Sequence, residues 1–158
     1  MSHTVIRRTE MVGASLNLGG QPLDLTEYST TGLMALAVGP RGFGKTNAGL
    51  LMAEQLSEQG WVSVLIDPEG ELESVYGAAV ADAEELRQRL TLRDVPIVVV
   101  SAKDALDFIP YGQVILEVAD ELRKPLFVCI DEGQLFSAAR KRADGVGEAC
   151  DIIAQFAE

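Results

Sequence analysis

The stretch that decides the fold is Gly39-Pro-Arg-Gly-Phe-Gly-Lys-Thr46. Its spacing matches G-x-x-x-x-G-K-[ST], the pattern of loops that cradle phosphate groups. The glycines allow a tight turn in which successive N–H groups point at phosphate oxygens. Lys45 would contact the β- and γ-phosphates, and Thr46 would offer its hydroxyl to Mg²⁺. The motif therefore predicts a site for ATP and Mg²⁺, formed by Gly39, Pro40, Arg41, Gly42, Phe43, Gly44, Lys45, Thr46 and Asn47.

The segments on either side of the loop fit the same interpretation. Residues 33–38 (LMALAV) are a short apolar run, typical of a strand that is buried on both faces. Residues 46–59 carry apolar side chains at helical spacing, and Gly60 is placed to end that helix. The alternative is a chance glycine-rich turn. It is disfavoured because strand, loop and helix follow in the order that a phosphate site at a helix N-terminus requires.

Composition limits the class of protein. The chain has 158 residues, of which 47% are hydrophobic, enough for one domain with a core. No apolar run approaches the ~20 residues that span a bilayer, and the N-terminus lacks the apolar segment of a signal peptide. Cys129 falls in a buried-strand pattern and Cys150 beside a helix pattern, so both are expected to be reduced. These features predict a cytoplasmic protein without a membrane partner.

The charge is strongly acidic. Thirteen Lys and Arg against 24 Asp and Glu give a net charge of −11. A surface of this sign repels the phosphate backbone of nucleic acids on average. The one basic cluster, Arg140-Lys141-Arg142, is better explained as a solvated loop than as a DNA contact. We therefore do not expect the chain by itself to hold DNA.

Strand and helix patterns alternate along the remaining sequence. Residues 15–25, with Gly19-Gly20 at the centre, predict a β-hairpin ahead of the loop. Core strands are predicted at 61–66, 96–100 and 126–131, and helices at 79–90, 111–123 and 149–156. This alternation predicts an α/β fold with a mostly parallel sheet and helices on both faces. The predicted division is an N-terminal lead-in, 1–32, and a nucleotide-binding core, 33–158.

Two carboxylates follow the last predicted strand, in residues 125–132 (PLFVCIDE). Asp131 is predicted to hold Mg²⁺ together with Thr46. Glu132 is predicted to orient or deprotonate the water that attacks the γ-phosphate, with Lys45 as the second catalytic residue. Strands also end in acids simply because they meet solvent there, but the complete loop upstream favours the functional interpretation. An acid directly after the Mg²⁺ aspartate favours a motor-type ATPase over a kinase.

Three stretches together resemble the HerA/FtsK superfamily of DNA-translocating ATPases, and within it the HerA-like branch. They are residues 39–47 (GPRGFGKTN), 66–71 (IDPEGE) and 128–134 (VCIDEGQ). The resemblance covers roughly residues 15–158. It implies a P-loop NTPase of the RecA/ASCE type that forms a homo-hexameric ring, pumps double-stranded DNA and works with a nuclease partner. Asp67 is interpreted separately as a loop cap, because Asp before Pro favours turns.

In that superfamily a further strand, ending in a polar sensor residue, inserts between the phosphate-loop strand and the Asp-Glu strand. Arginines nearby reach the nucleotide of the neighbouring subunit. Residues 151–158 stop within a helix pattern and show neither feature. We therefore expect a fragment of a larger ATPase, with a fold incomplete at its C-terminus. Two alternatives stay open: a nucleotide-binding module that switches a partner without turnover, and a small phosphotransferase, which Glu132 disfavours.

Overall fold

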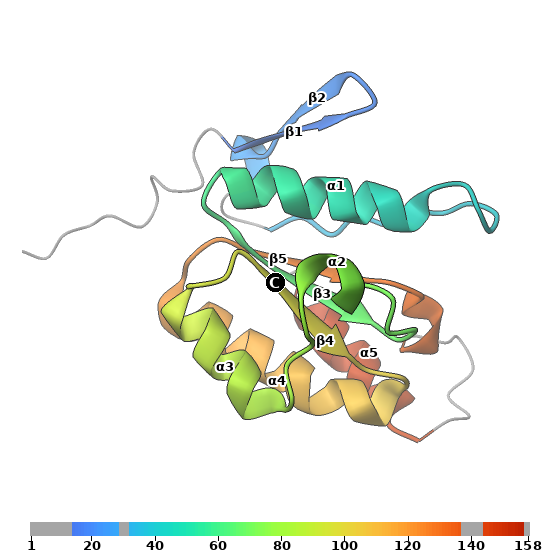
Figure 1. Cartoon of the computed structure of the whole chain (residues 1–158), viewed down its shortest axis with the longest axis vertical. Helices are drawn as coiled ribbons and strands as arrows, with labels where there is room; N and C mark the ends of the chain where they lie inside the picture. Colours follow the sequence, from blue (N-terminus) through green and yellow to red (C-terminus); the bar gives the residue numbers. More distant parts are fainter. Residues whose placement is uncertain (1–13, 29–31, 137–143, 157–158) are drawn as a thin grey trace, which may run out of the picture.

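The computed structural model describes residues 14–28, 32–136 and 144–156. Figure 1 shows the arrangement of the elements. In chain order the strands and helices are β1 Ser15–Leu18, β2 Gln21–Asp24, η1 Thr26–Tyr28, α1 Lys45–Glu58, β3 Val62–Asp67, α2 Glu73–Tyr76, α3 Ala83–Leu92, β4 Ile97–Ser101, α4 Ala105–Leu122, β5 Leu126–Ile130, η2 Gly133–Leu135 and α5 Val146–Gln155. The alternation of strands and helices confirms the predicted α/β class.

The core of the molecule is a parallel sheet with the strand order β4-β3-β5. Val64 of the central strand lies opposite Val98 of β4 and Val128 of β5. All of β3 is buried, whereas β5 is half-buried along its length. Because parallel strands bring their carboxyl ends to one edge of the sheet, the end of β3 at Asp67 and the turn after β5 at Asp131 lie on the same side of the molecule.

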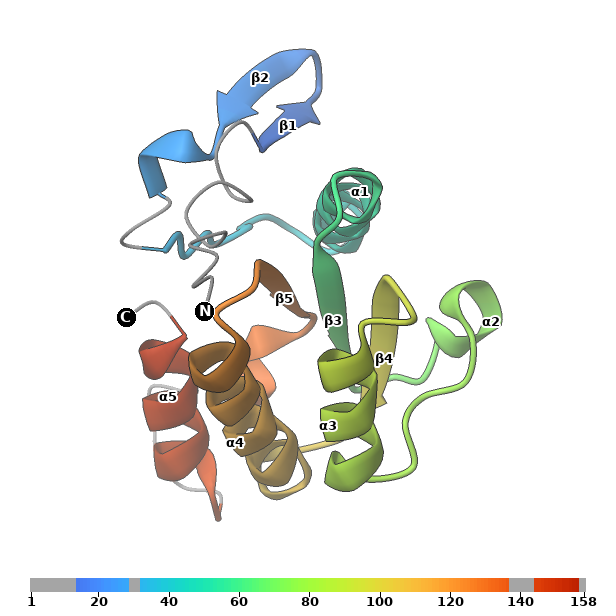
Figure 2. The ribbon, with the colours of Figure 1, turned by 90° about the vertical axis from the view of Figure 1, so that its left-hand side faces the viewer.

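Helices cover both faces of the sheet (Figure 2). On one face, α3, α4 and α5 pack against alternate residues of β3 such as Val64. On the other face lies α1, where Ala53 packs against Leu65. Successive side chains of a strand point to opposite faces, so one apolar strand supplies both layers. The antiparallel β1–β2 hairpin lies outside α1, and its Leu16 belongs to a separate cluster with Leu56.

Residues 33–38 contradict the prediction of a buried strand. They form no strand, and residues Leu36 and Val38 are 87% and 82% exposed. An apolar run becomes a buried strand only if a neighbouring strand shares its hydrogen bonds. In the described ranges, β3 is paired on both sides, and β5 pairs with β3 alone. The outer edge of β5 has no strand partner among the described residues, and residues 33–38 do not pair with it.

The other predicted elements are present with shifted ends. The predicted hairpin, the three sheet strands and α1 each agree with the structure to within a residue or so. Helix α4 begins at Ala105 instead of residue 111, because the Asp104 carboxylate caps it by accepting the Asp107 N–H at 2.9 Å. The exposed Pro110 lies in its second turn, where it has no N–H to donate to the helix. Helix α3 likewise begins at its Asp82 cap, later than predicted.

Two further differences concern the ends and the length of helices. Helix α5 begins at Val146, ahead of the predicted residue 149, and the short α2 was not predicted at all.

Among the described residues, no helix has both the length and the apolar character needed to cross a membrane.

Candidate functional site

The glycine-rich loop, residues 39–44, leads directly into α1. Gly42 and Gly44 have φ angles of 84° and 81°, in the left-handed region that favours glycine. Gly44 stands immediately before the helix, so Lys45 and Thr46 form its first turn. The backbone N–H groups of a first helical turn have no partner within the helix and carry its positive end. The loop therefore presents donors and positive charge toward an anion.

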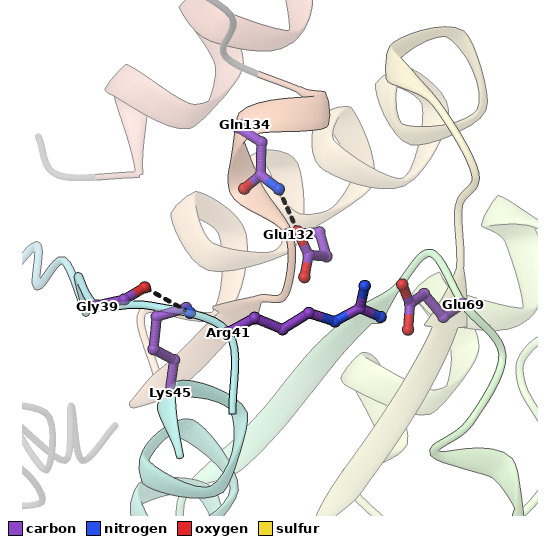
Figure 3. Close-up of a pocket in the computed structure, with 6 residues that line it drawn as sticks. All are labelled: Gly39, Arg41, Lys45, Glu69, Glu132 and Gln134. Atoms are coloured by element: carbon purple, nitrogen blue, oxygen red, sulfur yellow. Dashed lines mark hydrogen bonds between the residues drawn. The ribbon is translucent and has the colours of Figure 1, made fainter. Parts of the chain in front are cut away.

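Lys45 bends back over the loop. Its Nζ donates to the carbonyl oxygens of Gly39 at 2.8 Å and Pro40 at 3.1 Å. Figure 3 shows the first of these bonds. An ammonium group has three donor hydrogens, so one is left for a further acceptor. Lys45 thus places its positive charge beside the pocket that the loop borders.

Thr46 and Asp131 are in direct contact although they are 85 positions apart in the sequence. The Thr46 Oγ1 lies 3.1 and 3.2 Å from the two carboxylate oxygens of Asp131, and its single hydrogen is donated to one of them. The Asp131 N–H donates to the carbonyl of Ile66 at 3.1 Å, which ties it to the end of β3. The structure therefore brings together the two residues that were predicted to hold Mg²⁺.

A hydroxyl and a carboxylate suit Mg²⁺, which prefers oxygen ligands and usually takes part of its shell from waters and from the phosphates of a substrate. Within the parts of the chain that the structure covers, no group of three or more His, Cys, Asp or Glu side chains is placed to hold a metal alone. The Thr46–Asp131 pair thus fits a metal that is bound together with a phosphate ligand. It does not fit a metal caged by protein.

The contact depends on a close approach between α1 and β5. A Cβ on Gly49 would lie only 2.5 Å from the Sγ of Cys129, so no larger residue fits without movement. Gly49 lies one helical turn beyond Thr46, and Cys129 lies on β5, two residues before Asp131. Burial, together with the nearby Asp131 carboxylate, raises the pKa of the Cys129 thiol to about 11. Cys129 is therefore a neutral packing residue at ordinary pH, and it forms no disulfide, as predicted.

Glu132 has a backbone conformation that is unusual for a non-glycine residue. Its φ angle is 49°, in the left-handed region. Its N–H donates to the Asp131 Oδ1 at 3.0 Å, and its carboxylate accepts a hydrogen bond from the Gln134 side chain. The chain turns sharply here between β5 and η2, and the carboxylate lines the pocket. Such strain is found often at functional sites.

Asp67 caps the turn that follows β3, which confirms the interpretation of this residue as a loop cap. The residue is 2% exposed. Its Oδ1 accepts the N–H groups of Glu69 at 3.1 Å and Gly70 at 3.0 Å, and its Oδ2 accepts that of Leu72 at 2.8 Å. Three donors thus satisfy a buried carboxylate, and the turn is fixed to the core of the sheet.

These elements surround a pocket of about 360 Å³, a volume within the usual ~300–1,000 Å³ of ligand sites. Figure 3 shows its lining residues, which are Gly39, Arg41, Lys45, Glu69, Glu132 and Gln134. Of the residues predicted to bind the nucleotide, Gly39, Arg41 and Lys45 line the pocket. The others, Pro40, Gly42, Phe43, Gly44, Thr46 and Asn47, lie beside it in the loop and the first turn of α1.

Sequence reasoning missed Glu69 and Gln134. Glu69 was visible in the sequence within the Asp67-Pro-Glu turn, directly after a core strand. The carboxyl ends of adjacent parallel strands meet at one edge, and this rule is the signal that would have placed Glu69 near Glu132. The predicted basic cluster Arg140-Lys141-Arg142 lies outside the described residues.

Comparison with protein-family models, curated proteins and solved structures finds no match to this chain. Its function is therefore inferred from the side chains of the pocket and of the Thr46–Asp131 pair.

Proposed function

We propose that this chain is a P-loop ATPase, the motor domain of a double-stranded DNA translocase of the HerA/FtsK type. The observation that carries the proposal is the contact between Thr46 and Asp131. It joins the helix that follows the glycine-rich loop to the end of a neighbouring strand. A magnesium–nucleotide site needs a hydroxyl and a carboxylate at this place. The parallel sheet between two helical layers is compatible with a P-loop fold.

Each side chain then has a task that follows from its surroundings. The N–H groups of the loop and of the first turn of α1 bind phosphate oxygens, and Lys45 supplies a positive charge to the β- and γ-phosphates. Thr46 and Asp131 hold Mg²⁺, which when bound offsets the charge on those phosphates. Glu132 lines the same pocket as Lys45, so it is placed to orient or deprotonate the attacking water.

The assembly is proposed from the resemblance of the three motifs. In a homo-hexameric ring, loops that face a central channel would hold double-stranded DNA, and weak contacts would add across the subunits. A nuclease would be the partner that acts on the DNA ends.

Replacing Lys45 by alanine tests the nucleotide site. We expect Lys45→Ala to weaken the binding of Mg²⁺-ATP by about tenfold or more, because a lost charged hydrogen bond costs ~1.5–3 kcal/mol. The measurement is a calorimetric titration of both proteins. Lys103→Ala, which removes an exposed lysine outside the pocket, is the matched control and should leave the affinity unchanged. Equal affinities for the parent and Lys45→Ala would refute the site.

A nucleotide-binding switch without turnover is the second candidate. It is favoured because both proposed catalytic side chains are hydrogen-bonded to other groups of the chain. Lys45 donates to loop carbonyls, and Glu132 accepts from Gln134. Phosphate release from ATP decides between the two candidates. The switch would be supported if the parent binds ATP but releases phosphate no faster than the Glu132→Gln variant does.

A further inference from the structure

Arg41 is the second cation of the pocket, and the loop pattern predicts it only as one of the residues around the phosphates. It is the third residue of the glycine-rich loop and is exposed. Figure 3 shows its side chain running away from Lys45, with the guanidinium pointing toward the carboxylate of Glu69. The two cations therefore lie at different parts of the pocket. Lys45 stays at the loop carbonyls, and Arg41 extends to the opposite wall.

Glu69 has a fixed place on that wall. Its own N–H is one of the three that the buried Asp67 carboxylate accepts, and the turn is thereby anchored to the end of β3. A carboxylate that faces a guanidinium attracts it through its opposite charge. The Asp67-capped turn thus fixes the backbone of Glu69, whose carboxylate faces the Arg41 guanidinium (Figure 3).

Glu132 lines the pocket together with these groups. If Glu132 acts on the water that attacks the terminal phosphate, that phosphate must lie within reach of both Glu132 and Lys45. The Arg41 side chain extends through the same space (Figure 3). A guanidinium binds phosphate oxygens through two parallel hydrogen bonds, which a single ammonium group cannot do.

We propose that Arg41 contacts the γ-phosphate and makes the site select nucleoside triphosphates over diphosphates, with Glu69 as the positioning residue that holds the guanidinium there. The inference rests on the proposed nucleotide site. It assigns to the terminal phosphate an arginine of the same chain. The sequence alone had indicated no arginine for the terminal phosphate. A diphosphate ends before this point and loses the contact.

The test compares ATP with ADP, each with Mg²⁺, in calorimetric titrations of the 158-residue chain. We expect the parent to bind ATP more tightly than ADP. Arg41→Ala should weaken ATP binding about tenfold, the cost of a lost charge-assisted hydrogen bond, and change ADP binding less than twofold. Arg41→Lys should recover part of the loss, because it restores the charge without the paired hydrogen bonds.

Glu69→Gln should reduce the preference for ATP several-fold while the thermal midpoint stays unchanged, since a purely structural role would move stability instead. Glu71→Gln in the same turn is the matched control, because Glu71 does not line the pocket. If Arg41→Ala weakens the binding of ATP and ADP equally, or weakens the binding of neither, the inference is wrong and the nucleotide site stands. If the parent binds neither nucleotide, the proposed function fails and the inference fails with it.

Discussion

The two carboxylates that follow β5 have different surroundings, although they are adjacent in the sequence. Asp131 accepts hydrogen bonds from the Thr46 hydroxyl and from the Glu132 N–H, so its oxygens are held in place. Glu132 instead faces the pocket, with the side chain of Gln134 as its partner. A fixed carboxylate suits a metal ligand, and one that faces the pocket suits a group that acts on water. The proposed roles follow from this difference.

The role of Glu132 predicts a variant in which binding and turnover separate. Glu132→Gln keeps the shape and the hydrogen-bonding reach but removes the negative charge. In the ATP-hydrolysing protein we expect ATP affinity to stay nearly constant while turnover falls by about 10²-fold or more. Phosphate release and calorimetry measure the two quantities. Glu58→Gln, at the exposed end of α1, is the control. Hydrolysis at the parental rate would show that Glu132 is only a strand-end acid.

At the level of elements, the packing of α1 on β5 decides whether the site exists. Glycine inside a helix normally destabilises it by roughly 0.5–1 kcal/mol relative to alanine. Gly49 nevertheless suits this place, because an added Cβ would meet the Cys129 Sγ at 2.5 Å. The absence of a side chain lets the helix lie close enough for Thr46 to contact Asp131.

We therefore predict that Gly49→Ala destabilises the protein by about 1–3 kcal/mol, as overpacking of a core does, despite the better helix propensity of alanine. Cys129→Ala removes the sulfur that the new methyl group would meet. The loss of unfolding free energy in the double variant should be smaller than the sum of the losses in the two single variants. Denaturant unfolding of the four proteins gives the coupling. A stabilising effect of Gly49→Ala alone would contradict the close packing of α1 on β5.

The exposed segment 33–38 gives a second prediction for an element. Leu36 is 87% exposed, whereas Leu65 on β3 is 1% exposed. Leu36→Ala should change the free energy of unfolding by less than about 0.5 kcal/mol, and the same change at Leu65 should cost ~2–5 kcal/mol. Thermal or denaturant unfolding compares the pair. A large loss for Leu36→Ala would mean that these residues form a buried strand after all.

For the molecule as a whole, the net charge of −11 governs its behaviour toward nucleic acid. We predict that the isolated chain does not bind duplex DNA at ~150 mM salt, because several clustered cations are needed to neutralise several phosphates. Fluorescence anisotropy of a labelled duplex measures this. Micromolar binding that disappears when Arg140, Lys141 and Arg142 are neutralised would contradict the prediction and place a DNA contact in that cluster.

The sequence alone determined the features that depend on near neighbours along the chain. The glycine-rich loop and the start of α1 were predictable, because glycine conformation and helix periodicity are local properties. The parallel sheet was predictable as well, since strands separated by helices connect in parallel. The cap role of Asp67 was foreseeable for the same reason, because the N–H groups it accepts lie in the next few residues.

Only the tertiary structure decided which distant residues meet. The apolar run at 33–38 predicted a buried strand, but burial requires a partner strand, and no described strand pairs with it. Glu69 and Gln134 line the same pocket because β3 and β5 are adjacent parallel strands whose carboxyl ends lie together. The two motifs predicted that Thr46 and Asp131 meet although they are 85 positions apart, but their direct hydrogen bond depends on how closely α1 packs against the sheet. The distances in such contacts follow from packing between elements, which a local pattern of residues does not fix.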